Sequence, residues 1–169
     1  MTNPISLPST FLWDIAGVDG LAVMKRLIGE ECDRIAPFQS LETDLDHTPC
    51  TILRLCEANF RLRWMGDSAH LQSRLGVATA DQQVWVKQFP WLVSVPLLHG
   101  ISVEQLSGVA IARVPFSVEY LGMDCAAPVR IGRHGCLIWR HSIQGRAVIE
   151  LHSALQTIQE LKGTVPEIF

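Results

Sequence analysis

The sequence has few charged residues and no strong excess of one sign. Asp, Glu, Lys and Arg together make up 18% of the 169 residues, and the formal net charge is −3 at pH 7. The cationic residues are scattered along the chain and form no basic run. Because a nucleic-acid surface needs clustered lysine and arginine for its phosphate contacts, we expect no nucleic-acid partner.

Long apolar runs and leader-like segments are also lacking. The longest uncharged stretch, from Gln88 to Val103, contains two prolines and is too short to span a bilayer. The residues Met1–Pro4 do not begin the basic and apolar pattern of a signal peptide. The five cysteines are odd in number and irregularly spaced, which does not indicate a disulfide framework. We therefore predict one cytoplasmic domain over residues 1–169, with reduced thiols and no membrane span.

The signatures of common cofactors and nucleophiles are missing as well. The histidines show neither His-x-His nor His-Glu-x-x-His spacing, and the cysteines match no zinc pattern. The sequence contains no Gly-x-Ser-x-Gly, Walker or Gly-x-Gly-x-x-Gly motif. It therefore predicts neither a metal site nor a nucleotide site, and it does not indicate a serine hydrolase.

Apolar residues, by contrast, are abundant enough for a packed core. They make up 48% of the chain and include five Trp and six Phe. Apolar positions between Gly17 and Pro37 recur every three or four residues, which predicts an amphipathic helix. Thr48 and Pro49 suit a helix cap and a first helical position, so they predict a short helix ending near Asn59.

Strand patterns follow in the middle of the chain. The strict alternation of Phe60–Trp64 predicts a half-buried strand. We expect His70–Thr79 and Val84–Lys87 to form an antiparallel hairpin, and Phe89–Leu98 to form another strand that bends at its prolines. Ser102–Gln105 resembles a capping box that opens a short helix.

The C-terminal part has the clearest pattern. Leu137–Ile143 and Arg146–His152 flank the two-residue loop Gln144-Gly145, which is typical of a β-hairpin. Ser153–Lys162 predicts a closing helix, because a glycine follows directly. Helices first and antiparallel strands afterwards indicate an α+β fold.

Glu150 is the first candidate for chemistry. With Ile143 opposite Arg146 in the hairpin, counting outward places Trp139 opposite Glu150 on one face, with His141 beside them. A carboxylate desolvated among such groups would have a raised pKa and would suit general acid catalysis. The alternative is that this face is open to solvent and that Glu150 is an ordinary surface residue.

Arg74 is the second candidate. On the predicted strand His70–Thr79, its planar guanidinium group could bind a carboxylate in a bidentate manner. The alternative is a solvated cation on an amphipathic strand, since arginine is mostly exposed in proteins. For Arg61 and Arg63, a polar sheet face is the favoured interpretation.

Several segments together carry a resemblance to a known family. They are Asp44–Thr48, Ser73–Leu75, Ala80-Asp81, Val84–Val86, Val114–Leu121, Ile131–Arg133, Leu137–Arg140 and Gly145–Leu151. In their order, and in the closing hairpin above all, they resemble chorismate lyase (4-hydroxybenzoate synthase). The resemblance covers about residues 41–152.

The resemblance implies a fold, a reaction and a set of site residues. The fold would be α+β, with an antiparallel sheet and helices packed on one face. The reaction would eliminate pyruvate from chorismate and leave the aromatic acid 4-hydroxybenzoate for ubiquinone synthesis, with no metal or cofactor. Glu150 would transfer the proton, Arg74 would hold a substrate carboxylate, and Phe116 would offer its backbone N–H. Lys87 would be a second cationic contact, and Trp139 would shield the glutamate.

Two other functions stay open. A non-catalytic, effector-sensing domain of the same fold would bind a small aromatic acid without altering it. A fused DNA-binding segment would favour that function, and none is recognisable in the sequence. An adaptor within a larger assembly would instead expose a large apolar patch. The oligomeric state and the role of residues 1–40 are left open.

Overall fold

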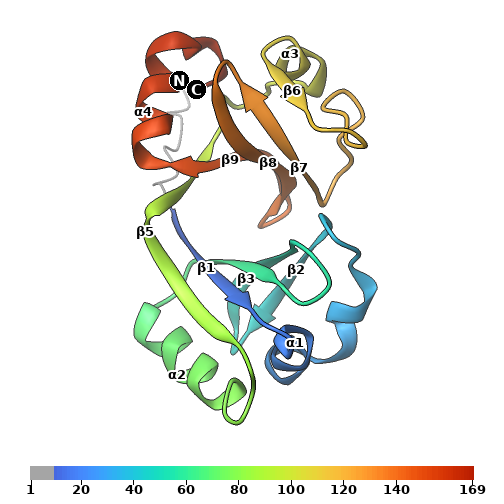
Figure 1. The fold of residues 1–169 in the computed structure, drawn as a ribbon, viewed down its shortest axis with the longest axis vertical. Coiled ribbons are helices and arrows are strands. Elements are labelled where there is room, and N and C mark those ends of the chain that lie inside the picture. Colours follow the sequence, from blue (N-terminus) through green and yellow to red (C-terminus); the bar gives the residue numbers. More distant parts are fainter. Residues whose placement is uncertain (1–9) are drawn as a thin grey trace.

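The computed structural model describes residues 10–169, and strands dominate this range (Figure 1). Its nine strands form one antiparallel sheet in the order β2-β3-β4-β1-β5-β9-β8-β7-β6. The strands are β1 (Thr10–Ala16), β2 (Ser40–Leu45), β3 (Thr48–Arg54), β4 (Phe60–Trp64), β5 (Trp85–Pro96), β6 (Ala110–Ala112), β7 (Cys125–Ile131), β8 (His134–Ile143) and β9 (Arg146–Ala154). The helices are α1 (Gly20–Ile28), η1 (Gly29–Arg34), α2 (Ser68–Ala78), α3 (Val103–Ser107), α4 (Leu155–Thr164) and η2 (Pro166–Ile168). Within the described range, no helix is both long and apolar enough to cross a membrane.

The long strand β5 runs through both halves of the molecule and connects them (Figure 1). Its first part pairs with β1, where Gln88 lies opposite Trp13, and its last residues pair with β9. The register of the β1–β5 pair then shifts, so that Val93 lies opposite Phe11. The four residues 89–92 of β5 therefore face a single residue of β1, Leu12. Such a bulge bends a strand and increases its twist, and here it lies between the two halves.

The first half consists of β1–β4, the start of β5, and the helices α1, η1 and α2. Apolar side chains alternate along the strands, so that one face of the sheet points toward α1 and α2. The α1 helix adds residues at helical spacing from the other side. The most deeply buried members of this core are Ile15, Val23, Met24, Cys32, Ile52, Phe60 and Leu71.

The second half has a core of its own. It consists of the end of β5, β6–β9, and the helices α3, α4 and η2. Leu106 of α3 and Ile158 of α4 pack in the same cluster as Ile138 of β8 and Leu151 of β9. Each half therefore has its own buried apolar layer, closed by different helices.

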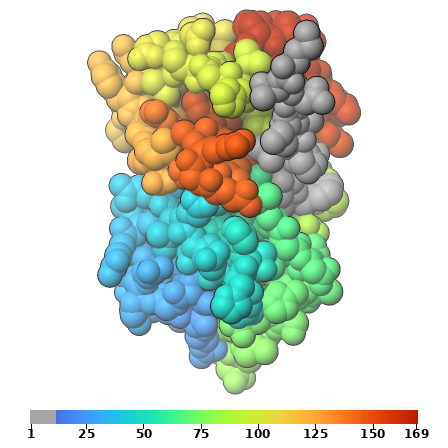
Figure 2. Space-filling view, turned by 180° about the vertical axis from the view of Figure 1, so that it is seen from behind, coloured from blue at the N-terminus to red at the C-terminus, as the bar shows by residue number. Residues whose placement is uncertain are grey.

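The two halves close on each other along a third, smaller region. The backbone N–H of Ala126 donates to the carbonyl oxygen of Phe38 at 2.8 Å. The turn between β8 and β9 also reaches across, since the N–H of Gln144 donates to the Glu42 carboxylate at 3.0 Å. Figure 2 shows this turn (orange) resting on the segment around β2 and β3 (cyan). A small apolar cluster between the halves consists of Leu53, Ala126 and Trp139.

The expected α+β fold, an antiparallel sheet with helices packed on one face as in chorismate lyase, is wrong. The sheet forms the bulk of the structure and curls into a half-barrel. Two separate cores lie at its two ends, and α1 and α2 cover one while α3 and α4 cover the other. The bulge of β5 contributes to the curl, because β5 bends there and carries the chain from one core to the other.

Local patterns nevertheless located several elements. Phe60–Trp64 is strand β4, and the early and closing helices are α1 and α4. The C-terminal hairpin is confirmed in its register, with Ile143 opposite Arg146 and Trp139 opposite Glu150. The capping box of α3 is also confirmed. These features depend on contacts between residues that are close in the sequence.

Two segments have a different structure from the one predicted. Thr48–Asn59 was expected to be helical, but its first part is strand β3. Asp46 and His47 form a two-residue turn with positive φ angles of 50° and 64°, which returns the chain alongside β2. His70–Thr79 was expected to be a strand, but it lies mostly in helix α2. Its buried residues follow a helical spacing, and the side chain of Asp67 caps its first turn.

Two helix glycines are expected to respond in opposite ways to alanine. A Cβ on Gly20 of α1 would overlap the carbonyl oxygen of Ala58, whereas a Cβ on Gly76 of α2 would have no atom within 4 Å. Gly20→Ala should lower the free energy of unfolding by about 2 kcal/mol or more, because backbone must shift. Gly76→Ala should raise it by about 0.5–1 kcal/mol, because alanine restricts the unfolded chain. Urea denaturation measures both, and a neutral Gly20→Ala would contradict the packing of α1.

Candidate functional site

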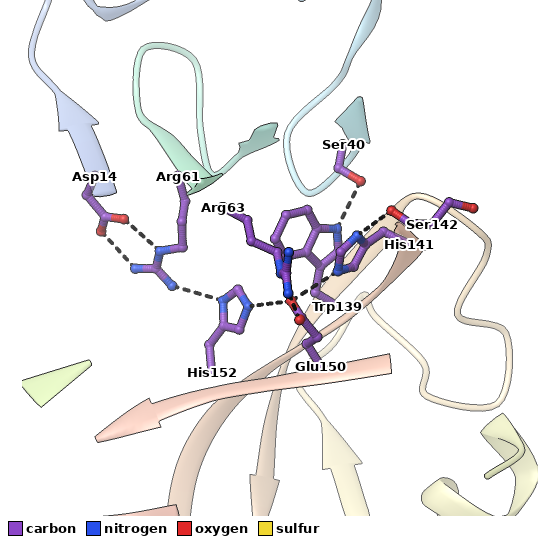
Figure 3. Close-up of polar contacts among 9 residues, drawn as sticks. All are labelled: Asp14, Ser40, Arg61, Arg63, Trp139, His141, Ser142, Glu150 and His152. Atoms are coloured by element: carbon purple, nitrogen blue, oxygen red, sulfur yellow. Dashed lines mark hydrogen bonds and ion pairs between the residues drawn. The ribbon is translucent and has the colours of Figure 1, made fainter. Parts of the chain in front are cut away.

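A buried ionic network lies where the two halves of the sheet meet (Figure 3). Strands β1 and β4 contribute its residues from one half, and β8 and β9 contribute them from the other. Neighbouring residues on each strand point into the apolar cores, so these side chains point the opposite way, toward the other half. We call this set the interlobe network. Its members are Asp14, Arg61, Arg63, His141, Glu150 and His152.

Glu150 is at the centre of the interlobe network and is only 1% exposed. Its Oε1 accepts a hydrogen bond from Nε of Arg63 at 2.8 Å. Its Oε2 lies 3.1 Å from Nε2 of His141 and 3.8 Å from Nε2 of His152. The carboxylate on one half is thus paired with a guanidinium group on the other half, and both charges are removed from solvent.

A second ion pair lies beside the first. Arg61 donates from two nitrogens to the two carboxylate oxygens of Asp14, at 2.7 and 2.8 Å. Such bidentate pairs are among the stronger hydrogen-bonded contacts in proteins. A further nitrogen of Arg61 donates to Nδ1 of His152 at 3.5 Å. Because Nδ1 is the acceptor, the proton of the neutral His152 ring lies on Nε2, which faces Glu150.

Trp139 closes one side of the interlobe network. Its indole ring stacks on the His141 ring with 3.9 Å between centroids. Its Nε1 donates to Oγ of Ser40 on β2 at 2.9 Å. The tryptophan is fully buried and lies opposite Glu150 in the β8–β9 register. Glu150 is therefore shielded by an aromatic side chain, as the hairpin register predicted.

Burial and pairing act in opposite directions on the pKa of Glu150. Burial raises this pKa, but hydrogen bonds with His141 and His152 and the charge of Arg63 hold it well below its usual value. The carboxyl group is therefore ionised and has no proton to donate. The expectation of a raised pKa suited to general acid catalysis is wrong. Burial lowers the pKa of His152 to about 4, so this ring is neutral near pH 7.

Two other predicted site residues already have partners elsewhere. Arg74 is on helix α2 and not on a strand, and its Nε lies 3.0 Å from a carboxylate oxygen of Asp46. The backbone N–H of Phe116 donates to the carbonyl oxygen of Arg113 at 2.8 Å, within a turn. Neither group is directed toward a ligand by these contacts.

Of the predicted site residues, the structure brings together Glu150 and Trp139. Lys87 lies on β5 and is exposed, with its Nζ 5.7 Å from the ring centroid of Phe89. None of the hydrogen bonds or ion pairs among residues 10–169 joins Glu150 to Arg74 or Lys87. The pairing of a glutamate with a substrate-binding arginine, which the resemblance implied, therefore has no counterpart in these contacts.

The partners of Glu150 were only partly predictable. The strand alternation places Arg61 and Arg63 on one face of β4, but it does not say that this face meets the second half. His152 had a usable signal, because the hairpin register puts it on the same face as Glu150 and Trp139. Polar residues on one face of a hairpin predict a buried contact only if a second polar face is known to pack against them. The sequence alone does not show that β4 packs against this hairpin.

Three aromatic side chains form a row on β5, apart from the interlobe network, and two of them, Trp85 and Trp91, are exposed while Phe89 is half-buried. The ring centroids of Trp85 and Phe89 are 6.2 Å apart, and those of Phe89 and Trp91 are 5.2 Å apart. Trp85 is 50% exposed and Trp91 is 55% exposed. Val86 packs against the first core, so the residues on either side of it face outward. We call Trp85, Lys87, Phe89 and Trp91 the aromatic row.

The described part of the chain has no group of three metal-ligating side chains arranged to hold a metal ion. In the interlobe network, arginine side chains are hydrogen-bonded to both carboxylates. All five cysteines are free.

Comparison with known proteins defines the fold. Neither a known protein family nor a curated protein matches the sequence. The structure is similar to that of the glycine cleavage system aminomethyltransferase T from Bartonella henselae, with a TM-score of 0.70 and 15% sequence identity. The match covers 91% of this chain and 42% of that chain, so this chain spans less than half of that protein's length. At this identity the likeness shows the fold alone, and it replaces the expected chorismate-lyase-like fold.

His152 is expected to make the stability of the protein depend on pH. Its pKa is about 4 in the folded state but about 6.5 in an unfolded chain, so the unfolded state takes up the proton first. The stabilisation is complete above about pH 6.5 and is lost as the pH falls toward 4. The loss between pH 7 and pH 5 should be roughly 2 kcal/mol. Urea denaturation at the two pH values measures it.

The matched variants are His152→Gln and His99→Gln. His152→Gln should remove most of the difference in unfolding free energy between the two pH values, because the variant has no buried imidazole. His99 lies in the exposed loop after β5, so its substitution is the control for losing a histidine. Equal pH dependence in the wild type and His152→Gln would show that another group is responsible.

Proposed function

We propose that this chain is an interaction subunit that docks onto a different polypeptide through the aromatic row. The observation that carries the proposal is the exposure of Trp85 and Trp91 on one strand, with the half-buried ring of Phe89 between them. Tryptophan is enriched among the residues that dominate binding energy at interfaces. Contiguous apolar surface of this kind is also the feature that an adaptor requires.

The chemistry of the aromatic row points to an apolar and acidic partner surface. Two tryptophans offer large apolar contacts, and Lys87 places a positive charge between them. A partner carboxylate would gain a charge-assisted hydrogen bond there, in surroundings that binding would dry. Pro90 has no backbone N–H and interrupts any long strand pairing at this edge. Side-chain contacts would therefore provide most of the affinity.

The interlobe network supports a structural role for the residue that would otherwise be the catalytic candidate. Glu150 is ionised, paired with Arg63 and shielded by Trp139. A carboxylate in this state holds the two halves of the sheet together. It thereby keeps β5 and its aromatic row in a fixed place.

The proposal predicts that one partner can be identified at the aromatic row. The full chain, carrying a photo-crosslinking amino acid in place of Trp91, should form a crosslink to one protein in its native cells. The same crosslink should not form when the photo-crosslinking amino acid replaces Val77 instead. Val77 is 72% exposed on α2 and belongs to no aromatic cluster. The purified partner should bind the wild-type chain, and Trp85→Ser should raise the dissociation constant of this complex by tenfold or more.

The control is Val77→Ser, which should leave this dissociation constant unchanged. Circular dichroism and the melting temperature test whether both variants keep their fold. The proposal fails if position 91 yields no crosslink above that at position 77. It also fails if the crosslinked protein is a second copy of this chain, or if Trp85→Ser binds as tightly as the wild type.

The elimination of pyruvate from chorismate, which the resemblance implies, is tested by a direct assay. We expect purified wild-type protein to form no 4-hydroxybenzoate above the spontaneous rate, because Glu150 has no proton to donate and Arg74 is paired with Asp46. Ultraviolet absorbance and chromatography of the product measure this. Turnover that disappears in Arg74→Ala, at an unchanged melting temperature, would restore the lyase assignment.

A further inference from the structure

A groove of about 790 Å³ opens at the edge of the second core, where β5 ends. Its walls include Val95 near the end of β5, Leu97 and Ile101 in the loop that follows, and Ile149 of β9. These side chains belong to the apolar layer of the second half, so the groove is the open end of that core. Its volume lies within the range of small-molecule sites, and its apolar walls are typical of them.

The groove also contains a cationic side chain, Arg140, with hydrogen-bond donors that are available to a ligand. Arg140 lies opposite Ile149 in the β8–β9 register and on the same face of β8 as the buried Ile138. One nitrogen of Arg140 donates to the carbonyl oxygen of Leu121 at 2.9 Å. A guanidinium group has five N–H donors, so this contact holds the side chain in place and leaves further donors for a ligand.

Two other charged side chains lie around the groove. Lys162 of α4 lies at one wall, with its Nζ 5.7 Å from the ring centroid of Phe169. Glu104 of α3 lies at the rim and is exposed. Arg140 and Lys162 are the two cationic side chains of the lining and Glu104 is its one carboxylate side chain, which favours an anionic ligand beside Arg140.

From this arrangement we infer that the groove binds a small organic monocarboxylate with an apolar body. The carboxylate is held by Arg140, whose planar fork fits its two oxygens. The apolar body lies against Leu97, Ile101 and Ile149, and binding is favoured because it removes these side chains from water. The site is separate from the aromatic row, and the inference does not depend on the proposed docking function.

The chemistry disfavours the other ligand classes that the walls would tolerate. A neutral apolar molecule would cover the Arg140 guanidinium and offer it no acceptor, which is costly for a charged group. A cation would meet Arg140 and Lys162 and be repelled. Two ligands with the same apolar body should therefore differ in affinity if only one of them carries a carboxylate.

Calorimetric titration with indole-3-acetate and with the neutral indole-3-acetamide tests this property on the wild-type chain. The two probes share their aromatic body and differ in charge. The acid should bind at a single site, and at least tenfold more tightly than the amide, because only the acid can accept a charge-assisted bidentate contact. Decanoate is a second acid probe with a linear body, and binding by either acid satisfies the expectation.

Arg140→Gln should weaken binding of the acid by tenfold or more. Arg146→Gln is the matched control, because Arg146 is exposed at the β8–β9 turn and does not line the groove. Binding of neither acid at millimolar concentration, equal affinity for acid and amide, or unchanged affinity in Arg140→Gln would each overturn the inference. If the melting curve shows that Arg140→Gln does not fold, the acid and amide affinities of the wild type decide it.

Discussion

The ion pair between Arg63 and Glu150 determines how the two halves of this protein face each other. Each half buries its own apolar residues, so hydrophobic burial within the halves does not select one relative placement. A buried charge without its partner costs about 3–5 kcal/mol. The halves must therefore meet with β4 opposite β9. The ion pair selects this placement mainly because any other placement of the halves would bury one of the two charges without its partner.

The rest of the interlobe network keeps that pair in balance. Asp14 neutralises Arg61, and Arg61 in turn fixes the ring of His152 by donating to Nδ1. The neutral His152 ring then faces Glu150 without adding a positive charge there. Glu150 stays ionised through its contacts with Arg63, His141 and His152.

Those parts of the structure that depend on near neighbours in the sequence were predictable. The β8–β9 hairpin placed Trp139 opposite Glu150 from its two-residue turn alone. The curl of the sheet was not predictable, because it depends on a bulge and on contacts such as the Arg63–Glu150 pair, whose members are 87 positions apart. Arg74 was misplaced because the alternation of Leu71 and Leu75 with polar residues fits both a strand and the buried face of a helix. The outward direction of Trp85 likewise follows from which side of β5 meets a core.

The bulge in β5 also limits which changes in chain length the protein can accept. Val86 packs against the first core, and Val93 and Val95 pack in the second, so the core-facing positions change from even to odd numbers across the bulge. Side chains alternate strictly along a strand. Loss or gain of a single residue at 89–91 would turn Ser94 toward the apolar layer and the two valines away from it. This short segment of β5 is thus held to one length by the cores on either side of it.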